Sequence, residues 1–464
     1  MNLTIKQLAE ILKGKLSGKQ NTSFSGFSID SRTLTSGNIF LTLKGDRFDG
    51  HNFVNDAIAR GAAGIICEKK LDIKSPFIQV KSCQDALFKL AQYHRNTLKS
   101  FFIAITGSNG KTTTKTLLAK IMGLTAPTFA SPGNYNNHIG VPLSLLKIET
   151  SHKFSVLELG MNDFGEISFL KNIVKPHAAI ITNIGYSHLE KLKNLEGVAR
   201  GKKELLWNPF APKEVYLPKD DDFFDFLKTK IEGEVISFGT SPEADLRLAS
   251  AKTSNTGTAL KIHYSGKTFS FKTRLRGKIF IKNLLPVLAF CLHHKIAVEV
   301  IQNALSVFEP LDDRGRVESF QKKQIKIIKD FYNSNPSSLI ESVDLLSLYR
   351  GYVKIAVIGD MLELGDMESD CHRDIGRAMS RKPVDFLFTF GNASEIISGV
   401  FNSSKKREIK ARHFYDIKKL FQALKNLIKS ISQPKVVLIK GSRGMKMERL
   451  FHLLQSLFEH SADR

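Results

Sequence analysis

The sequence predicts an α/β protein of three domains. Its 464 residues are enough for about three domains of ordinary size. Apolar residues make up 42% of the chain and charged residues 24%, which suits several packed cores and excludes a disordered or collagen-like chain. Over two long regions, short apolar runs alternate with amphipathic segments, a pattern typical of parallel sheets with helical crossovers.

Residues 1–95 predict a small α+β domain, because short apolar runs are separated by clusters of Gly, Ser, Asn and Asp. Residues 4–7 (TIKQ) form a capping-box pattern, and Ile5, Leu8 and Leu12 follow at helical spacing. The N-terminus is therefore expected to start a helix rather than to be a signal peptide. No stretch reaches the ~18 consecutive apolar residues of a membrane-spanning helix, so no integral membrane segment is expected.

Residues 96–310 predict a central domain with a parallel sheet of the P-loop ATPase type. A continuous apolar run at 101–105 (FFIAI) leads into a glycine-rich turn and a helical stretch at 112–122. Further buried strands are expected at 155–157 and 178–182. Alternating lysines and apolar residues around 261–272 indicate an antiparallel section near the end of this domain.

Residues 311–464 predict a third domain, because the alternation restarts after Pro310. Helical segments separate the expected strands, which indicates a second parallel, Rossmann-like sheet. These strands are expected at 326–329, 353–358, 386–390 and 435–439.

The charge balance is strongly basic: 68 Lys and Arg against 45 Asp and Glu give a net charge of +23. Such an excess suits nucleic acid, an anionic membrane surface or anionic substrates. Residues 405–429 carry nine of the basic side chains, and their apolar residues recur at helical spacing. This stretch predicts an amphipathic helix with a solvated basic side, and no aromatic residues alternate with the charges as in a base-stacking surface. We therefore expect no nucleic-acid partner, although a P-loop nucleic-acid-binding ATPase is the rival from another class.

Four cysteines are spread along the chain without any CxxC spacing: Cys67, Cys83, Cys291 and Cys371. This distribution argues against a disulfide scaffold and against a cysteine zinc site. A reducing, cytoplasmic location is expected.

Residues 106–113 (TGSNGKTT) predict a phosphate-binding loop between a strand and a helix. Glycines let backbone N–H groups approach phosphate oxygens, Lys111 adds a positive charge, and the Thr112 hydroxyl suits Mg²⁺. The strict P-loop spacing is not met, because Ile105 stands where its first glycine belongs. The alternative is a glycine-rich connection with an exposed lysine.

Two further polar residues follow predicted strands of the same sheet. Glu158 ends one strand, and His188 lies a few residues beyond the next. Because ligands of open parallel sheets bind at the carboxyl ends of strands, both residues are expected near the phosphate loop. Glu158 suits Mg²⁺ well, whereas His188 is a poorer ligand for this hard cation. Taken singly, each has an ordinary alternative, a salt-bridged strand end and a surface histidine.

Together with the phosphate loop, these motifs give the chain a resemblance to the Mur ligase superfamily. In the central domain it is carried by residues 106–113, 133–143 (GNYNNHIGVPL), 158–166 and 183–190 (NIGYSHLE). In the first domain it is carried by residues 30–32, 37–40 and 49–51. In the third domain it is carried by residues 330–336 (DFYNSNP), 359–365 (GDMLELG) and 440–443. The resemblance thus spans almost the whole chain.

The resemblance implies an ATP-dependent acid–amino-acid ligase of peptidoglycan precursor synthesis. Residues 330–336 are similar to the members that join D-alanyl-D-alanine to the terminal carboxylate of UDP-N-acetylmuramoyl-tripeptide. That reaction passes through an acyl phosphate and yields the pentapeptide, ADP and phosphate. Members that add diaminopimelate or lysine carry a Tyr-Ala-His type motif and a DNPR signature, and DNPR is absent here. A Mur ligase that adds a different amino acid is the alternative, and the third peptide residue, diaminopimelate or lysine, stays open.

The same resemblance implies the roles of individual residues. ATP would be bound by Gly107, Ser108, Asn109, Gly110, Lys111, Thr112, Thr113, Asn283, Arg316 and Asp330. Two Mg²⁺ ions would be held by Thr112, Glu158, His188 and Lys202, the last as a carbamylated lysine with carboxylate-like oxygens. Lys111, His188 and Lys202 would be catalytic, and Ser31 and Arg32 would help to hold the uridine diphosphate. Lys203 is the alternative position for the modified lysine, and a helix-surface lysine is the alternative for either.

The resemblance also implies a UDP-muramoyl-binding role for the first domain, and we expect a monomer.

Two segments depart from the family pattern. The usual basic-His-Asn sequence before the adenine asparagine is replaced at 277–280 by GKIF, so Ile279 and Phe280 would hold the base less tightly or by stacking. Residues 192–194 (LKN) replace the usual Phe-Gly-Ser, which we interpret as loop variation.

Overall fold

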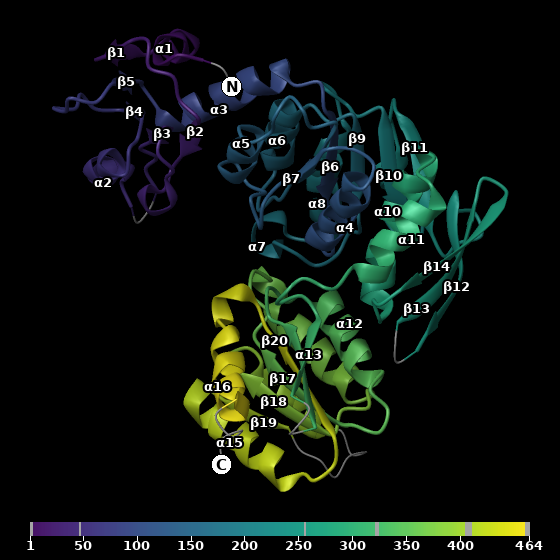
Figure 1. Ribbon diagram of the computed structural model, residues 1–464. Helices are drawn as coiled ribbons and strands as arrows, with labels where there is room; N and C mark the ends of the chain where they lie inside the picture. Colours follow the sequence, from purple (N-terminus) through teal and green to yellow (C-terminus); the bar gives the residue numbers. More distant parts are fainter. Residues whose placement is uncertain (1–2, 46–47, 255–256, 321–323, 404–410, 460–464) are drawn as a thin grey trace.

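The computed structural model describes residues 3–45, 48–254, 257–320, 324–403 and 411–459. Three β-sheets follow one another along the chain, and each lies within one of the predicted domain ranges (Figure 1). The predicted three-domain α/β architecture is therefore confirmed. No helix in the described part of the chain combines the length and the apolar character needed to cross a bilayer.

The first sheet has five strands in the order β1-β5-β4-β3-β2, and only the pairing of β1 with β5 is antiparallel. The strands are β1 (Lys15–Ser17), β2 (Gly26–Ser28), β3 (Asn38–Leu41), β4 (Gly64–Cys67) and β5 (Phe77–Gln79). The helices are α1 (Ile5–Leu12), α2 (Val54–Ala59) and α3 (Cys83–Thr97). The predicted capping box begins α1, since Thr4 Oγ1 accepts from Gln7 N and Gln7 Oε1 accepts from Thr4 N.

The central sheet has nine strands in the order β14-β13-β12-β11-β10-β9-β6-β8-β7. Its strands are β6 (Phe101–Thr106), β7 (Thr128–Ala130), β8 (Phe154–Glu158), β9 (Ala178–Ile181), β10 (Glu214–Pro218), β11 (Glu234–Gly239), β12 (Leu246–Thr253), β13 (Thr258–Tyr264) and β14 (Lys267–Thr273). All pairs from β7 to β12 are parallel, whereas β12, β13 and β14 form the predicted antiparallel section. The strands expected at 101–105, 155–157 and 178–182 correspond to β6, β8 and β9.

Helices cover the central sheet (Figure 1), and the phosphate loop runs from the carboxyl end of β6 to the start of α4. They are α4 (Lys111–Gly123), α5 (Gly140–Leu145), α6 (Glu166–Val174), α7 (Leu189–Leu192), α8 (Leu195–Lys203), α9 (Phe224–Lys228), α10 (Lys278–His293) and α11 (Val298–Val307). Helix α10 is buried over most of its circumference and packs on α4 and the sheet, which fits its almost uninterrupted apolar sequence.

The third sheet has six strands in the order β15-β16-β20-β17-β18-β19, all parallel except β15. The strands are β15 (Arg316–Phe320), β16 (Ile325–Asp330), β17 (Val353–Gly359), β18 (Phe386–Phe390), β19 (Arg412–Phe414) and β20 (Lys435–Lys440). The helices are α12 (Pro336–Ser347), α13 (Glu368–Met379), α14 (Glu395–Ser403), α15 (Ile417–Ser430) and α16 (Glu448–Glu459). All four strands predicted for this domain are present.

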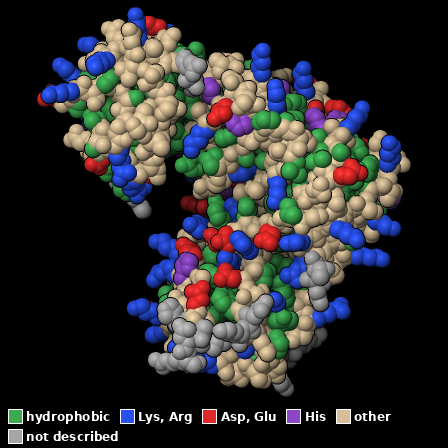
Figure 2. Space-filling view, in the orientation of Figure 1, with side chains coloured by type: hydrophobic (Ala, Val, Ile, Leu, Met, Phe, Trp, Pro, Cys, Tyr) green, Lys and Arg blue, Asp and Glu red, His purple; other side chains and the backbone are tan. Residues whose placement is uncertain are grey.

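The basic stretch at 405–429 forms a shorter helix than predicted. Helix α15 begins only at Ile417, because Asp416 caps it by accepting from the backbone N–H groups of Lys418 and Lys419. The preceding Arg412 pairs with β18 as part of strand β19, and residues 405–410 lie outside the described residues. Within α15 the apolar side is buried and most lysines are exposed, as predicted. On the face shown in Figure 2, Lys and Arg side chains are scattered rather than gathered in one stripe.

The packing of α10 gives a stability prediction. Phe290 is fully buried, and its ring centroid lies 4.2 Å from that of His294 and 5.5 Å from that of Tyr216. Phe290→Ala is expected to lower the free energy of unfolding by about 3–5 kcal/mol, because it leaves a cavity in the core. Urea unfolding followed by the fluorescence of Trp207, the single tryptophan, measures this. The control Leu124→Ala, at a side chain 56% exposed, should change it by less than about 0.5 kcal/mol.

Candidate active site

The phosphate loop follows β6 and requires glycine at two positions. Gly107 has φ +147° and Gly110 has φ +80°, conformations that L side chains rarely adopt. A Cβ atom on Gly107 would lie 1.8 Å from Thr182 Oγ1, and one on Gly110 would lie 1.9 Å from Asn283 Oδ1. The loop can therefore pack this closely on its neighbours only because both residues lack a side chain.

The segment after β9 holds the loop in place. Ser108 N donates to Asn183 O over 3.0 Å, and Asn109 N donates to Asn183 Oδ1 over 3.0 Å. Thr182 Oγ1 donates to Asn109 O over 2.6 Å, and Ser108 Oγ donates to Gly185 O over 2.8 Å. Thr182 and the first residues of the segment 183–190, which was singled out in the sequence, thus position the loop.

Lys111 is the first residue of α4 and directs its side chain back along the loop. Its Nζ donates to Gly107 O over 2.7 Å and to Ser108 O over 3.3 Å. Burial lowers the pKa of Lys111, and the nearby Glu158 carboxylate partly opposes this. The alternative of an exposed lysine is therefore wrong. The side chain is half-buried, and carbonyl oxygens of the loop hold its amine.

Glu158 ends β8 and meets the loop, as the sequence predicted. Thr112 Oγ1 donates to Glu158 Oε2 over 2.8 Å, and Asn136 Nδ2 donates to Glu158 Oε1 over 2.8 Å. Lys115 Nζ lies 3.7 Å from Glu158 Oε2 and donates to Ser131 O over 2.7 Å. The sequence reasoning missed Lys115 and Asn136. Lys115 lies one helical turn after Lys111, and Asn136 lies within residues 133–143, so both carried a signal.

His188 pairs with a residue of the third domain. His188 has a left-handed backbone, and its Nδ1 lies 2.7 Å from Glu363 Oε2. The hydrogen bond from His188 lowers the pKa of Glu363. Glu363 was not predicted as a site residue, although residues 359–365 had been singled out. This pair joins the loop after β9 to the loop after β17.

Lys202 and Lys203, at the end of α8, point in different directions. Lys202 is only 2% exposed, and burial together with the charge of Lys111 places its pKa well below the usual range for lysine. Burial therefore favours the neutral, nucleophilic form of its amine. Lys203 Nζ instead donates to Phe226 O and lies 4.3 Å from the centroid of the Phe226 ring. Neither lysine is the helix-surface residue that the sequence left as an alternative.

A cavity of about 220 Å³ lies between the central and third domains. The central domain lines it with Ser108, Asn109, Gly110, Lys111, Thr113, Asn136, Glu158, His188, Ile279, Phe280 and Asn283. The third domain and the connection to it line it with Arg314, Asp330, Tyr332, Asn333, Ser334, Asn335, Ser338 and Lys440. Most of the predicted ATP-binding residues are thus brought together, as expected for a ligand at the carboxyl edge of a parallel sheet.

Two predicted ATP-binding residues need separate description. Arg316 lines a neighbouring cavity, where its guanidinium lies 3.7 Å from Glu309, and the cavity with the phosphate loop is lined by Arg314 instead. Phe280 belongs to the walls of both cavities. Asp330 is buried at the end of β16, where Lys440 Nζ donates to its Oδ2 over 2.8 Å. Nothing in the sequence distinguishes Arg314 from Arg316 as the residue that lines the cavity.

The predicted uridine-diphosphate residues lie in the first domain and do not line this cavity. Ser31 is buried and begins the 3-10 helix Ser31–Thr33, which Asp30 caps. The side chain of Arg32 is 84% exposed and pairs with Asp30 over 2.7 Å. Hydrogen bonding to Arg32 lowers the pKa of the Asp30 carboxyl. Arg32 thus presents an ordered cation to solvent on a separate domain.

The donor set beside the phosphate loop fits Mg²⁺. Thr112 and Glu158 offer hard oxygens in contact with each other, and Mg²⁺ usually takes one or two carboxylates together with phosphate oxygens. Throughout the described ranges, no group of three or more His, Cys, Asp and Glu side chains forms a closed metal site.

Three profiles of known protein families match the chain. They are "Mur ligase family, catalytic domain" at residues 23–96, "Mur ligase middle domain" at 105–291 and "Mur ligase, glutamate ligase domain" at 315–443. The chain is 33% identical to the UDP-N-acetylmuramoyl-tripeptide–D-alanyl-D-alanine ligase of Bacillus subtilis (strain 168), covering 96% of this chain and 97% of the relative. It is 31% identical to the protein of that name from Escherichia coli (strain K12), covering 98% and 99%.

Solved structures resemble the chain over nearly its full length. The crystal structure of MurF from Acinetobacter baumannii matches with a TM-score of 0.88 and 30% identity, covering 99% of both chains. The MurF ligase of Thermotoga maritima in complex with ADP matches with a TM-score of 0.81 and 26% identity, covering 95% of this chain and 99% of that one. A nucleotide complex thus exists for a protein of the same three-domain shape.

The position of Lys111 gives a prediction for nucleotide turnover. Lys111→Ala removes a cation from the loop and is expected to lower the rate of phosphate release from ATP by at least ~10²-fold, as for the loss of one group that stabilises transition-state charge. The fold should persist, because Ala suits the first turn of α4. Steady-state kinetics and thermal unfolding measure the two effects. The control Lys120→Ala, on the exposed end of α4, should keep the wild-type rate, and more than half the activity in Lys111→Ala would contradict the assignment.

Proposed function

The chain belongs to the Mur ligase family, and we propose on that premise that it joins D-alanyl-D-alanine to the terminal carboxylate of UDP-N-acetylmuramoyl-tripeptide at the expense of ATP. The observation that carries the proposal is full-length similarity to ligases of that name, at 31–33% identity. The sequence analysis singled out residues 330–336 for this acceptor. Members of this segment, among them Asp330, Asn333 and Asn335, line the cavity. The products are the UDP-muramoyl pentapeptide, ADP and phosphate.

The domains divide this work in our proposal. Residues 1–95 bind the UDP-muramoyl end, with Ser31 and the ordered cation of Arg32 at the diphosphate. Residues 96–310 bind ATP on the phosphate loop, and residues 311–464 close over it and present the acceptor. We propose that the protein acts as a cytoplasmic monomer, which fits the buried, free thiols of its four cysteines.

The chemistry is an attack of one anion on another followed by an amide-forming substitution. The tripeptide carboxylate oxygen bonds to the γ-phosphorus while the bond to ADP breaks, giving an acyl phosphate. The dipeptide amine then bonds to the acyl carbon, phosphate leaves, and the amine loses a proton. Lys111 and the N-terminus of α4 place positive charge where negative charge accumulates in the first step. Asn183 and Thr182 hold the loop in position, so that little reorganisation is needed.

Thr112 and Glu158 would hold one Mg²⁺, and His188 with a carbamylated Lys202 would hold a second. When bound, the ions neutralise charge on the phosphates. The burial of Lys202 supports the modification, because a neutral amine can attack CO₂, form the N–C bond and lose a proton. The product is an anionic carbamate. It removes the repulsion between Lys202 and Lys111 and adds oxygen ligands.

Acceptor dependence tests the proposed function. The purified protein is expected to release phosphate from ATP at full rate only when UDP-muramoyl tripeptide and D-Ala-D-Ala are both supplied, since the acyl phosphate is discharged by the dipeptide amine. Coupled phosphate detection with mass analysis of the pentapeptide measures both products. Matched reactions with single amino acids and a UDP-muramoyl dipeptide are the control. Equal turnover there would instead support a ligase that adds a different amino acid.

Acetate rescue tests the role of Lys202. If Lys202 carries a carbamate, Lys202→Ala loses an anionic ligand, and acetate should restore part of the activity by offering the same oxygens. A cationic lysine predicts no rescue by any anion. The variant is assayed across an acetate series at fixed ionic strength, because screening alone changes rates in a protein of net charge +23.

Lys203→Ala is the matched control, because the Lys203 amine donates to Phe226 O. Its activity should not depend on acetate. Rescue of Lys203→Ala instead of Lys202→Ala would move the modified residue by one position. Full activity of Lys202→Ala without acetate would remove Lys202 from the site.

A further inference from the structure

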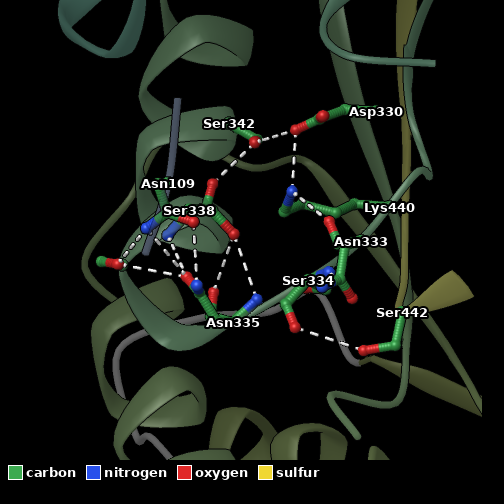
Figure 3. Close-up of polar contacts among 10 residues, drawn as sticks. Asn109, Asp330, Asn333, Ser334, Asn335, Ser338, Ser342, Lys440 and Ser442 are labelled. Atoms are coloured by element: carbon green, nitrogen blue, oxygen red, sulfur yellow. Dashed lines mark hydrogen bonds and ion pairs between the residues drawn. The ribbon is translucent and has the colours of Figure 1, made fainter. Parts of the chain in front are cut away.

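The phosphate loop makes direct side-chain contacts with the third domain through Asn109 (Figure 3). Asn335 Nδ2 donates to Asn109 Oδ1 over 2.8 Å, and Asn109 Nδ2 donates to Asn335 Oδ1 over 3.4 Å. Asn109 Nδ2 also donates to Ser337 Oγ over 2.9 Å. The backbone of Asn109 is bound to Thr182 and Asn183, so this side chain extends from a fixed loop.

Asn335 is equally fixed on its own side of the interface. It is the N-cap of α12, where its Oδ1 accepts from Ser338 N over 2.9 Å and its backbone N donates to Ser338 Oγ over 3.1 Å. Asn335 is only 8% exposed. The side-chain amide of Asn335 therefore both caps α12 and forms hydrogen bonds with Asn109 of the phosphate loop.

A hydrogen-bond network connects this cap to the rest of the third domain (Figure 3). The Ser342 hydroxyl lies within hydrogen-bonding distance of both Ser338 O and Asp330, and Lys440 Nζ donates to Asp330 Oδ2 and to Asn333 O. The series of hydrogen bonds from Asn335 to Asp330 thus passes through the buried side chains of Ser338 and Ser342. The cap is held rigidly to the ends of β16 and β20.

The same network reaches the second interdomain contact. Ser442 Oγ donates to Ser334 O over 3.2 Å and accepts from Leu362 N over 2.9 Å. Leu362 precedes Glu363, whose carboxylate pairs with His188. Ser442 therefore ties together the two segments of the third domain that contact the loops after β6 and β9.

We propose that Asn335 is a positioning residue that acts through Asn109 and locks the third domain onto the phosphate loop. This inference rests on the proposed function. It assigns Asn335 the task of keeping the cavity closed between the two chemical steps. With the lock formed, the acyl phosphate meets only the dipeptide amine. With the lock broken, water attacks the acyl carbon, phosphate leaves, and the tripeptide carboxylate is regenerated with ATP consumed.

The variant Asn335→Ser separates locking from folding. Serine is about as good an N-cap as asparagine, so α12 keeps its start, but its shorter side chain cannot reach Asn109. Asp416→Ser is the matched control, because it exchanges the N-cap of α15 in the same domain for the same residue, away from the phosphate loop. Both full-length variants are compared in thermal unfolding and in the complete ligation reaction.

The expected readout is the ratio of phosphate released to amide formed. In the wild type and in Asp416→Ser this ratio should be one. In Asn335→Ser the rate of amide formation is expected to fall roughly tenfold, as for the loss of about two ordinary hydrogen bonds, and the ratio should rise above one. The melting temperature should match that of Asp416→Ser. A ratio of one in Asn335→Ser would overturn the proposal, whatever the rate, since a merely structural role slows both products together.

A double variant tests whether Asn335 acts through Asn109. In an Asn109→Ala background, where the amide partner is already missing, Asn335→Ser should change the ratio and the rate little further. An equally large additional effect in that background would show that Asn335 acts by another route and would overturn this part of the inference.

A distance measurement separates the lock from the proposed function. Spin labels on Lys261→Cys and Gln422→Cys report the spacing of the central and third domains without any substrate, and the four native cysteines are buried and do not compete for label. Asn335→Ser should broaden the distance distribution relative to the labelled wild type, and an unchanged distribution would overturn the lock. A wild type that fails to ligate D-Ala-D-Ala would instead refute the proposed function and leave this measurement intact.

Discussion

Gly107 and Gly110 approach Thr182 and Asn283 more closely than any Cβ atom would permit, and the rest of the site depends on this contact. It packs the phosphate loop simultaneously on the end of β9 and on helix α10. The loop then places Lys111 and Thr112 at the first turn of α4, within reach of Glu158 at the end of the neighbouring strand β8. A side chain at either glycine would separate β6 from β9 or α4 from α10, and the cluster would disperse.

The electrostatics of the site follow from the same close packing. Lys115 and Lys202 are 3% and 2% exposed, and Lys111 is half-buried. Glu158 is the carboxylate that interacts with Lys111 and Lys115. Burying more cations than anions costs free energy, which is why burial lowers the pKa of all three lysines. A polyanionic ligand relieves this imbalance. The region is thus less stable alone than a neutral core would be, and it is prepared for phosphate.

The sequence predicts the sheets well because strands of a parallel sheet are buried on both faces and therefore appear as continuous apolar runs. It also predicts that Thr112 and Glu158 converge, because carboxyl ends of parallel strands share one edge. It could not predict Asn335 or Glu363, whose partners lie more than 170 residues away in another domain. Nor could spacing distinguish Lys202 from Lys203, since the rotation of α8 about its axis is set by tertiary packing. The early start assigned to α15 failed for a local reason, the cap at Asp416.

The contacts between the central and third domains differ between the connecting segment and the phosphate loop. Near the connecting segment, Leu345 of α12 packs on Gly277 at the start of α10, and Gly315 lies against the Phe280 ring. Two polar pairs, Arg276 with Tyr349 and Lys282 with Glu341, accompany this apolar contact. At the phosphate loop the contacts are polar, through Asn335 and Glu363. Burying apolar surface away from water stabilises the contact between two domains. Each neutral hydrogen bond contributes only about 0.5–1.5 kcal/mol, because water can replace either partner. Breaking the contacts at the phosphate loop therefore costs less free energy than separating α12 from α10, where apolar packing adds to the polar pairs.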